Sequence, residues 1–215
     1  LLIAGLHADK LLLKAGHKGV GTQLQAEILA LAALEGLAVL EALEELHTVF
    51  PDLIPIMSDV SYETDSRFGD ASSFRERLEA ICSHEILHTI PQVEPIGPKA
   101  LLDALVIAPC TGNTIAKLAN GIADTPVTLA AKAHLRNEAP IILAVSTNDA
   151  LAGNAANIGA LLNRKHYYFV PFRQDDPAKK PTSLVADFSL VPAAIDAALE
   201  GRQLQPVLLG PQEAD

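Results

Sequence analysis

The order of apolar and polar positions predicts short buried strands that alternate with helices. Three apolar runs, at residues 104–109, 140–146 and 167–172, have the length and continuity typical of strands buried in a parallel sheet. Segments of about ten residues with a helical pattern lie between and after these runs. These expected helices are residues 74–81, 114–123, 126–137, 156–165 and 191–202. The pattern predicts an α/β fold with a doubly wound, mainly parallel sheet and helices on both faces, as in Rossmann-like three-layer proteins.

The region before the first of these strands is less regular. An apolar run that contains a proline, at residues 52–58, predicts a strand near a sheet edge or a strand end. A polar stretch leads to the helix at 74–81, for which Ser72 and Ser73 are candidate N-caps. A second short helix and a proline-rich loop at 91–99 follow. We expect all of these elements to belong to one domain, residues 1–215.

The sequence predicts that residues 1–47 form an atypical, helical N-terminal part of that domain. Strong helix formers fill the stretch from Gln23 to His47. Its main apolar side is formed by Ile28, Leu29, Val39, Leu40, Leu43 and Leu46. Leu31 and Leu34 fall instead on the acidic side, where they make a second apolar strip. Such a strip favours packing against another subunit or another helix rather than contact with water, and we expect a homo-oligomer or a complex with a partner subunit.

Composition and charge narrow the class of protein. The formal net charge is −10 and Lys and Arg do not cluster, so neither nucleic acid nor an anionic membrane is an expected partner. Cys82 and Cys110 lie outside any metal-binding spacing. The most apolar stretch, Ile28 to Leu43, is interrupted by Glu35 and Glu41 and is shorter than a membrane span. We therefore expect a cytoplasmic protein.

Two turns that follow buried strands carry groups suited to ligand binding. Residues 108–114 combine small side chains with hydroxyl groups, so backbone N–H groups can approach a planar ring or an anion. Residues 146–149 offer two hydroxyls, an amide and a carboxylate, which can bind a heterocycle or a dicarboxylate. Each turn also has a structural interpretation: a helix capped by Thr111 or Asn113, and an Asx turn, respectively. Both lie where ligands bind in α/β sheets, beyond the carboxyl ends of the strands.

A charged loop before the last helix is a third candidate. Its cations Arg173, Lys179 and Lys180 are suited to a dianionic substrate, although a solvated loop held by Asp–Lys pairs explains them equally well. His84 and His88 are four residues apart on an expected helix, but no third ligand accompanies them. We therefore expect no bound metal.

Several segments resemble known flavoproteins. The run APCTGNTIAKLANGIADTP resembles the PASANT-type segment of the family that includes homo-oligomeric flavin-containing cysteine decarboxylases, with Thr111 and Gly112 in place of the small central residues. Further segments are similar to the dipicolinate synthase B-subunit family. They include SRFGDASSF, VEPIGPK, TPVTLAAKAHLRNEAP, AVSTNDALAGNAANIGALL and YYFVPFRQDDPAKKPTSLVADFSLVP. The ordered series runs from Ser66 to Leu208, about two thirds of the chain.

The resemblance implies a cofactor, a partner and a reaction. It implies FMN bound at the two strand-end turns, with Asn113 reaching the ligand or substrate as the candidate catalytic residue. It also implies an A subunit that binds NADP, and the oxidation of dihydrodipicolinate, a small dicarboxylate, to dipicolinate in sporulating bacteria. The alternatives are a flavin-dependent decarboxylase or prenyltransferase of the same superfamily, or a non-catalytic partner that stabilises the A subunit. The candidate cofactor-binding residues are Pro109, Cys110, Thr111, Gly112, Asn113, Thr114, Ser146, Thr147, Asn148 and Asp149.

The N-terminal part departs from this family pattern. Members usually open with a strand and a Gly/Thr/Ser loop that holds the flavin phosphate, and residues 1–47 lack that loop in its usual form. The nearest candidate is Gly19-Val20-Gly21-Thr22, before the long helix. An ungapped register places the loop near residues 30–36, where this chain is rich in leucine and alanine.

Overall fold

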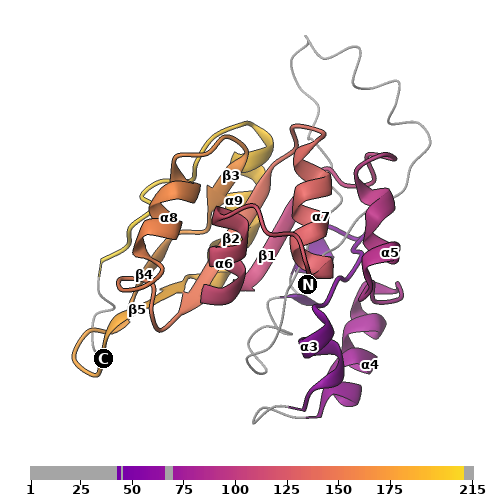
Figure 1. Ribbon diagram of the computed structural model, residues 1–215, viewed down its shortest axis with the longest axis horizontal. Coiled ribbons are helices and arrows are strands. Elements are labelled where there is room, and N and C mark those ends of the chain that lie inside the picture. Colours follow the sequence, from indigo (N-terminus) through magenta and orange to yellow (C-terminus); the bar gives the residue numbers. More distant parts are fainter. Residues whose placement is uncertain (1–42, 45, 66–69, 211–215) are drawn as a thin grey trace.

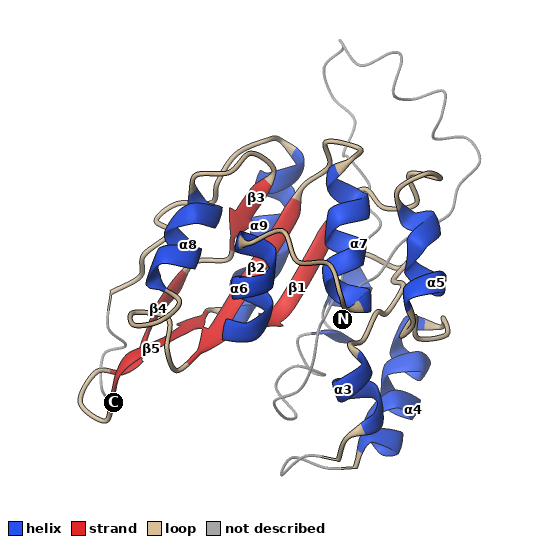
Figure 2. Cartoon of the chain, viewed as in Figure 1, coloured by secondary structure: helices blue, strands red, loops and turns tan. Residues whose placement is uncertain are grey.

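The chain folds into a mixed sheet with helices on both faces. The computed structural model describes residues 43, 44, 46–65 and 70–210 (Figure 1). The strands are β1 (Leu105–Cys110), β2 (Ile141–Thr147), β3 (Tyr167–Phe169), β4 (Phe172–Asp176) and β5 (Lys180–Ala186). The helices α6 (Gly112–Ala119), α7 (Pro126–Leu135) and α8 (Ala155–Leu162) cover one face, and α9 (Val191–Leu199) covers the other (Figure 2). The predicted α/β fold with helices on both faces is confirmed.

The strands β1, β2 and β3 form the parallel part of the sheet. Ile142 of β2 pairs with Val106 of β1 on one side and with Tyr168 of β3 on the other. Further along β2, Ser146 and Thr147 pair with β5 in the antiparallel direction. The carboxyl end of β2 therefore lies beside an antiparallel hairpin, β4–β5, rather than beside β3.

This hairpin corrects two sequence-based expectations. The apolar run at 167–172 is not one strand, because β3 ends at Phe169 and β4 begins at Phe172. Pro171 lies between them and has no N–H group to continue a ladder. The expected charged loop at 173–181 is the distal half of the hairpin, with Asp176 paired to Lys180 beside the turn. Its charged side chains hid the strand pattern, since the hairpin exposes most of them to solvent.

The region before β1 is more helical than predicted. A short helix, α3 (Asp59–Glu63), lies in the expected polar stretch, and α4 spans Ala71–Cys82. The cap of α4 is Asp70, whose Oδ1 accepts a hydrogen bond from the backbone N–H of Ser73 (2.7 Å), so Ser72 and Ser73 were the wrong N-cap candidates. Both serines lie in the first turn instead.

Two proline-containing segments also differ from prediction. The run at 52–58 forms a single parallel bridge between Ile56 and Leu87 instead of a strand, because Pro55 offers an acceptor but no donor. The expected loop at 91–99 contains α5 (Ile90–Val93) and the 3-10 helix η1 (Glu94–Ile96). In both of these helices proline occupies one of the first two positions, where its missing N–H costs no hydrogen bond.

The core is built around the parallel strands. Every residue of β1 is buried, as are residues 141–145 of β2. A helical segment ends at Val49, and its Leu43 and Leu46 are buried as their apolar positions predicted. Of residues 1–47, the structure describes residues 43, 44, 46 and 47. Leu31, Leu34 and the candidate loop Gly19–Thr22 lie outside the described residues. Among the described helices, none has the length and apolar character needed to cross a membrane.

Both cysteines are buried in this core as free thiols, and their reactivity therefore tests how tightly the core is packed. Cys82 is 1% exposed and Cys110 is 0% exposed, and burial raises the pKa of Cys82 to about 12 and raises that of Cys110 as well. Because only the thiolate is reactive, we expect neither thiol to react with DTNB at about pH 8 in the folded protein, and both to react in guanidinium chloride. Immediate release of one equivalent of thionitrobenzoate from the native protein would contradict the described packing.

Candidate functional site

A cavity of about 550 Å³ lies beyond the carboxyl ends of β1 and β2. The turns after these two strands and both strands of the β4–β5 hairpin contribute to its walls. Its lining residues are Pro109, Thr111, Ser146, Thr147, Asn148, Asp175, Lys180, Ser183, Leu184 and Val185. All three segments that the sequence nominated therefore meet around one cavity.

The turn after β1 brings a helix start directly to this cavity. The β1–β2 ladder shifts register between Ile107 and Cys110, and the peptide bond between Ala108 and Pro109 is cis. Thr111 then adopts an extended backbone conformation, and α6 begins at the next residue. Thr111 is the N-cap by position, but its side chain makes no capping hydrogen bond, and its Oγ1 lies 3.4 Å from Oγ1 of Thr114. Thr111 is exposed and lines the cavity, and its hydroxyl does not cap the helix end.

Gly112 is the point where the two turns touch. A Cβ added at Gly112 would lie 2.7 Å from both Asn154 Nδ2 and Asp149 Oδ1, and 2.8 Å from Thr147 Oγ1. These separations are shorter than real Cβ contacts allow, so a larger residue forces the side chains of Thr147, Asp149 and Asn154 to move. The absence of a side chain at residue 112 thus lets the start of α6 pack against the turn that follows β2.

Hydrogen bonds hold the turn after β2 in place. Thr147 Oγ1 donates to Asp149 Oδ1 (2.6 Å), and Asn154 Nδ2 donates to Asp149 Oδ2 (2.7 Å). Asn157 Nδ2 in turn donates to Asn154 Oδ1 (2.9 Å). The hydrogen bond from Thr147, followed by that from Asn154, holds the pKa of Asp149 below its usual value. The carboxylate of Asp149 therefore organises the turn as an anion, through side-chain partners rather than through the backbone N–H of an Asx turn, and α8 begins after Asn154 without a side-chain cap.

This network also orients the groups that line the cavity. Because the Thr147 proton is used by Asp149, the oxygen of Thr147 is left to accept hydrogen bonds. The Asn148 carbonyl accepts from Thr182 Oγ1 (2.6 Å), and Asn148 Oδ1 lies 3.4 Å from the donor Ser183 Oγ. That contact directs the oxygen of the Asn148 amide toward β5 and leaves its NH₂ group to donate.

Of the three cations in the charged segment, Lys180 reaches the cavity. Lys180 Nζ lies 2.6 Å from Asp175 Oδ2, and both residues line the cavity wall. Arg173 pairs instead with Asp187 (2.9 Å) and is 18% exposed. Lys179 is 85% exposed and pairs with Asp176 (3.7 Å). The hairpin thus presents one ammonium and one carboxylate to the cavity from this segment.

The other nominated residues take different positions. Cys110 and Gly112 are buried, and Asn113 and Thr114 lie on the first turn of α6. Asn113 is exposed and does not line the cavity, so its catalytic role stays a prediction. Sequence reasoning missed the wall formed by β5, namely Ser183, Leu184 and Val185. The run of apolar and β-branched residues at 182–186 was the available signal for this strand.

The two histidines considered as a metal pair do not share a helix. His84 Nε2 lies 3.0 Å from Asp52 Oδ1, while the His88 ring stacks on Tyr62 with centroids 3.7 Å apart. The helical spacing assumed for them is wrong, because α4 ends at Cys82 and the residues around Leu87 are extended. In residues 43–65 and 70–210, apart from 45, no three His, Cys, Asp or Glu side chains are grouped to hold a metal.

A three-layer α/β fold with a polar cavity at the carboxyl ends of its parallel strands is the architecture of open α/β proteins that bind their ligands at that edge of the sheet. The chain belongs to the flavoprotein family, whose sequence profile, described as Flavoprotein, matches residues 32–179.

Known relatives make the assignment more specific. The chain is 44% identical over 172 residues to the B subunit of dipicolinate synthase from Bacillus subtilis (strain 168), a match that covers 80% of this chain and 86% of that protein. The crystal structure of the B subunit of dipicolinate synthase from Bacillus halodurans superposes with a TM-score of 0.76 at 39% identity, covering 85% of this chain and 95% of that one. The FMN-dependent cysteine decarboxylase SpaF shares the fold, with a TM-score of 0.60 at 21% identity over 82% of this chain and 97% of that one.

The contact at Gly112 yields a direct test of how the site is built. We expect Gly112→Ala to destabilise the protein by about 1 to 3 kcal/mol, because the added methyl group collides with the Thr147–Asp149–Asn154 network. Thermal unfolding followed by circular dichroism measures the loss.

A matched glycine in α8 provides the control. A Cβ at Gly159 meets no atom within 4 Å, so Gly159→Ala should stabilise the helix by roughly 0.5 to 1 kcal/mol. Equal melting temperatures for Gly112→Ala and the unaltered protein would show that the two turns are not tightly packed.

Proposed function

We propose that this protein binds FMN in the strand-end cavity and acts with an A subunit to oxidise dihydrodipicolinate to dipicolinate. The observation that carries the proposal is the convergence of the two strand-end turns and Lys180 on one cavity of about 550 Å³. This volume lies within the roughly 300 to 1,000 Å³ range of small-molecule and cofactor sites. Homology to the B subunit of dipicolinate synthase supports the choice of reaction.

The lining groups fit a flavin ring. Leu184, Val185 and Pro109 supply apolar wall, while Thr111, Ser146 and Thr147 supply hydroxyl oxygens. A flavin ring needs this combination, because its faces are apolar and its pyrimidine edge both donates and accepts hydrogen bonds. The phosphate of FMN is expected to be held by residues outside the described part of the chain, and Gly19–Thr22 is the sequence candidate.

The same wall suits a dicarboxylate substrate. The ammonium of Lys180 can bind a carboxylate in a charge-assisted hydrogen bond, and its ion pair with Asp175 fixes its position at the cavity. The Asn148 amide can donate to a second carboxylate oxygen. Two donors on different elements would orient a flat ring that carries two carboxylates.

The oxidation of dihydrodipicolinate to dipicolinate removes one hydride and one proton. Because no amino-acid side chain accepts a hydride, FMN on this chain and NADP on the A subunit would supply the redox chemistry. The role assigned to this chain is to bind and orient. The hairpin and the two turns would surround the ring of the dicarboxylate substrate and exclude water from its faces. They would also fix the direction of the substrate's two carboxylates.

Flavin binding is the first prediction of this proposal. We expect the purified protein to quench FMN fluorescence at a stoichiometry of one per chain. Replacing Ser146 by Ala should weaken binding roughly two- to tenfold, since one hydrogen bond contributes about 0.5 to 1.5 kcal/mol. Ser72→Ala, on the exposed side of α4, is the matched control and should leave binding unchanged. Association with the A subunit without any flavin binding would instead support a non-catalytic, stabilising role.

Product formation is the second prediction. The A and B subunits together should form dipicolinate faster than the A subunit alone. We expect Thr111→Val to lower this rate severalfold without unfolding the domain, since Thr111 lines the cavity and a lost ligand hydrogen bond costs about 0.5 to 1.5 kcal/mol. Asn113→Ala should have the same effect, since the role carried over to Asn113 requires the bound ligand to extend from the cavity over the first turn of α6. Asn120→Ala, at the other end of α6, serves as the control. Equal rates with and without the present chain would refute the proposed reaction, and full activity in both variants would place the site elsewhere.

A further inference from the structure

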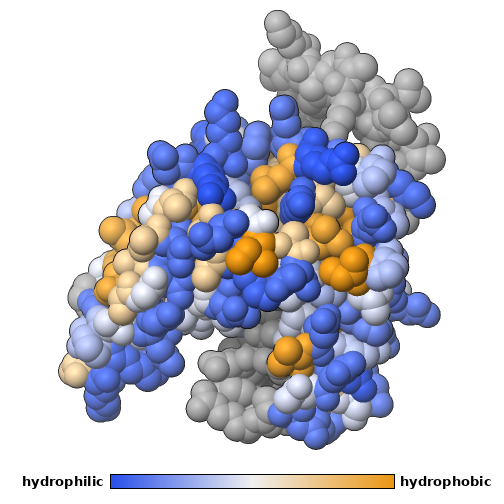
Figure 3. All heavy atoms as spheres, viewed as in Figure 1, coloured by the Kyte–Doolittle hydropathy of each residue, from blue (hydrophilic) through white to orange (hydrophobic). Residues whose placement is uncertain are grey.

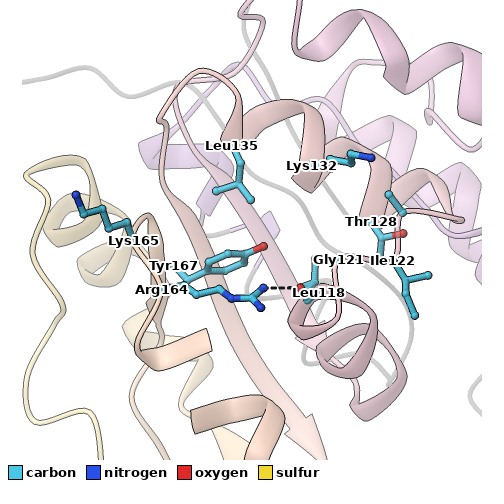
Figure 4. A pocket seen from close by; sticks show the side chains of 10 residues that line it. Leu118, Gly121, Ile122, Thr128, Lys132, Leu135, Arg164, Lys165 and Tyr167 are labelled. Atoms are coloured by element: carbon cyan, nitrogen blue, oxygen red, sulfur yellow. Dashed lines mark hydrogen bonds between the residues drawn. The ribbon is translucent and has the colours of Figure 1, made fainter. Parts of the chain in front are cut away.

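A second cavity, of about 390 Å³, lies at the opposite edge of the sheet. It is bounded by the end of α6, by α7 and by the residues that lead into β3 (Figure 4). Because β3 is parallel to β2, its first residue, Tyr167, marks the amino ends of the strands. The proposed flavin site lies at their carboxyl ends, so the two cavities are separated by the length of the sheet.

The walls of this cavity are largely apolar, with two buried polar residues, Thr128, whose hydroxyl bonds to Thr125, and Tyr167. Leu118, Ile122 and Leu135 contribute aliphatic surface, and Ile122 is 47% exposed. Apolar surface is visible over the region of α6 and α7 on the face shown in Figure 3. Tyr167 is only 8% exposed, yet its hydroxyl points into the cavity in Figure 4. Among the described residues, none forms a hydrogen bond with that hydroxyl, so it remains available to a ligand.

The charged groups of the lining are all cations. Arg164 donates from Nη1 to the carbonyl of Leu118 (3.1 Å) and from Nη2 to that of Ala119 (2.6 Å). These bonds use two of its five N–H donors and hold the guanidinium at the cavity wall. Lys132 lines the opposite side and is exposed. Lys165 also belongs to the lining, although its side chain extends away from Tyr167 in Figure 4.

No aspartate or glutamate lines this cavity, although the protein carries a net charge of −10. Its cations are therefore not neutralised by the lining itself. A bare inorganic anion would satisfy them but would leave the aliphatic walls in contact with water. A neutral apolar molecule would cover the walls but would leave the buried Tyr167 hydroxyl without an acceptor and would make no use of the positive charge of Arg164 and Lys132.

We propose that this cavity is a binding site for a small carboxylate with an aromatic or aliphatic body. The carboxylate accepts hydrogen bonds from the Tyr167 hydroxyl and from Arg164, and Lys132 adds a favourable charge. The body of the ligand covers Leu118, Ile122 and Leu135. The site is independent of FMN and of the proposed oxidation.

Three probe molecules separate these contributions. Benzoate has both the body and the charge, benzamide has the body without the charge, and acetate has the charge without the body. Isothermal titration calorimetry is carried out on the full chain in saturating FMN, which occupies the proposed flavin site. We expect one benzoate per chain, bound at least roughly tenfold more tightly than benzamide or acetate, because the lining needs both features.

Three single substitutions show which of the two cavities binds the benzoate. Tyr167→Phe keeps the ring and removes the hydroxyl, and should weaken binding about threefold. Lys132→Gln removes an exposed charge and should weaken it about threefold at low salt. Lys180→Gln removes an equal charge from the strand-end cavity and should leave benzoate binding unchanged. If Tyr167→Phe alters the circular dichroism spectrum, the exposed Lys132→Gln variant decides the question.

Two results would overturn the proposal. One is benzoate binding that is no tighter than that of benzamide or acetate. The other is benzoate binding that weakens in Lys180→Gln but not in Lys132→Gln, which would place the ligand in the strand-end cavity. Loss of flavin binding alone would refute the proposed function and leave this site intact, so the two proposals fail separately.

Discussion

The close approach of α6 to the turn after β2 is the contact on which the strand-end site depends. Gly112 lies against Thr147, Asp149 and Asn154 at distances that leave no room for a side chain. The Asp149 carboxylate receives hydrogen bonds from both neighbours and stays ionised, so the turn is held by strong, charge-assisted bonds. Two segments far apart in the sequence thereby form one rigid edge, and the groups on that edge keep fixed directions.

The sheet topology determines what faces this edge. The first half of β2 pairs with β3, but its last residues pair with β5, so the hairpin extends the sheet beyond the end of β3. As a result β5 forms a wall of the cavity, and Lys180 and Asp175 lie near its rim. An all-parallel sheet would leave this side open. The hairpin adds a wall to this strand-end cavity, whose volume of about 550 Å³ is within the range of small-molecule sites.

The sequence predicted the parts of this arrangement that rest on local patterns. Continuous apolar runs identified β1 and β2, and the polar residues after them identified the two turns. The hairpin was missed because its charged residues mask the alternation of a strand, and because its partner strand, β2, is distant in the sequence. The steric role of Gly112 was also hidden, since it depends on Asn154, a residue that only the fold brings close. A sequence therefore identifies the chemical groups of each turn, whereas the contacts between turns can be predicted only when the sheet topology is known.

Occupation by FMN of the cavity between the two turns and the hairpin is the central claim about this protein. Amide hydrogen–deuterium exchange with and without FMN tests it most directly. We predict slower exchange on FMN addition in residues 111–114, 146–148 and 183–185, with no change in residues 121–135 around the second cavity. Protection confined to residues 121–135, or no protection at either strand-end turn, would contradict this claim.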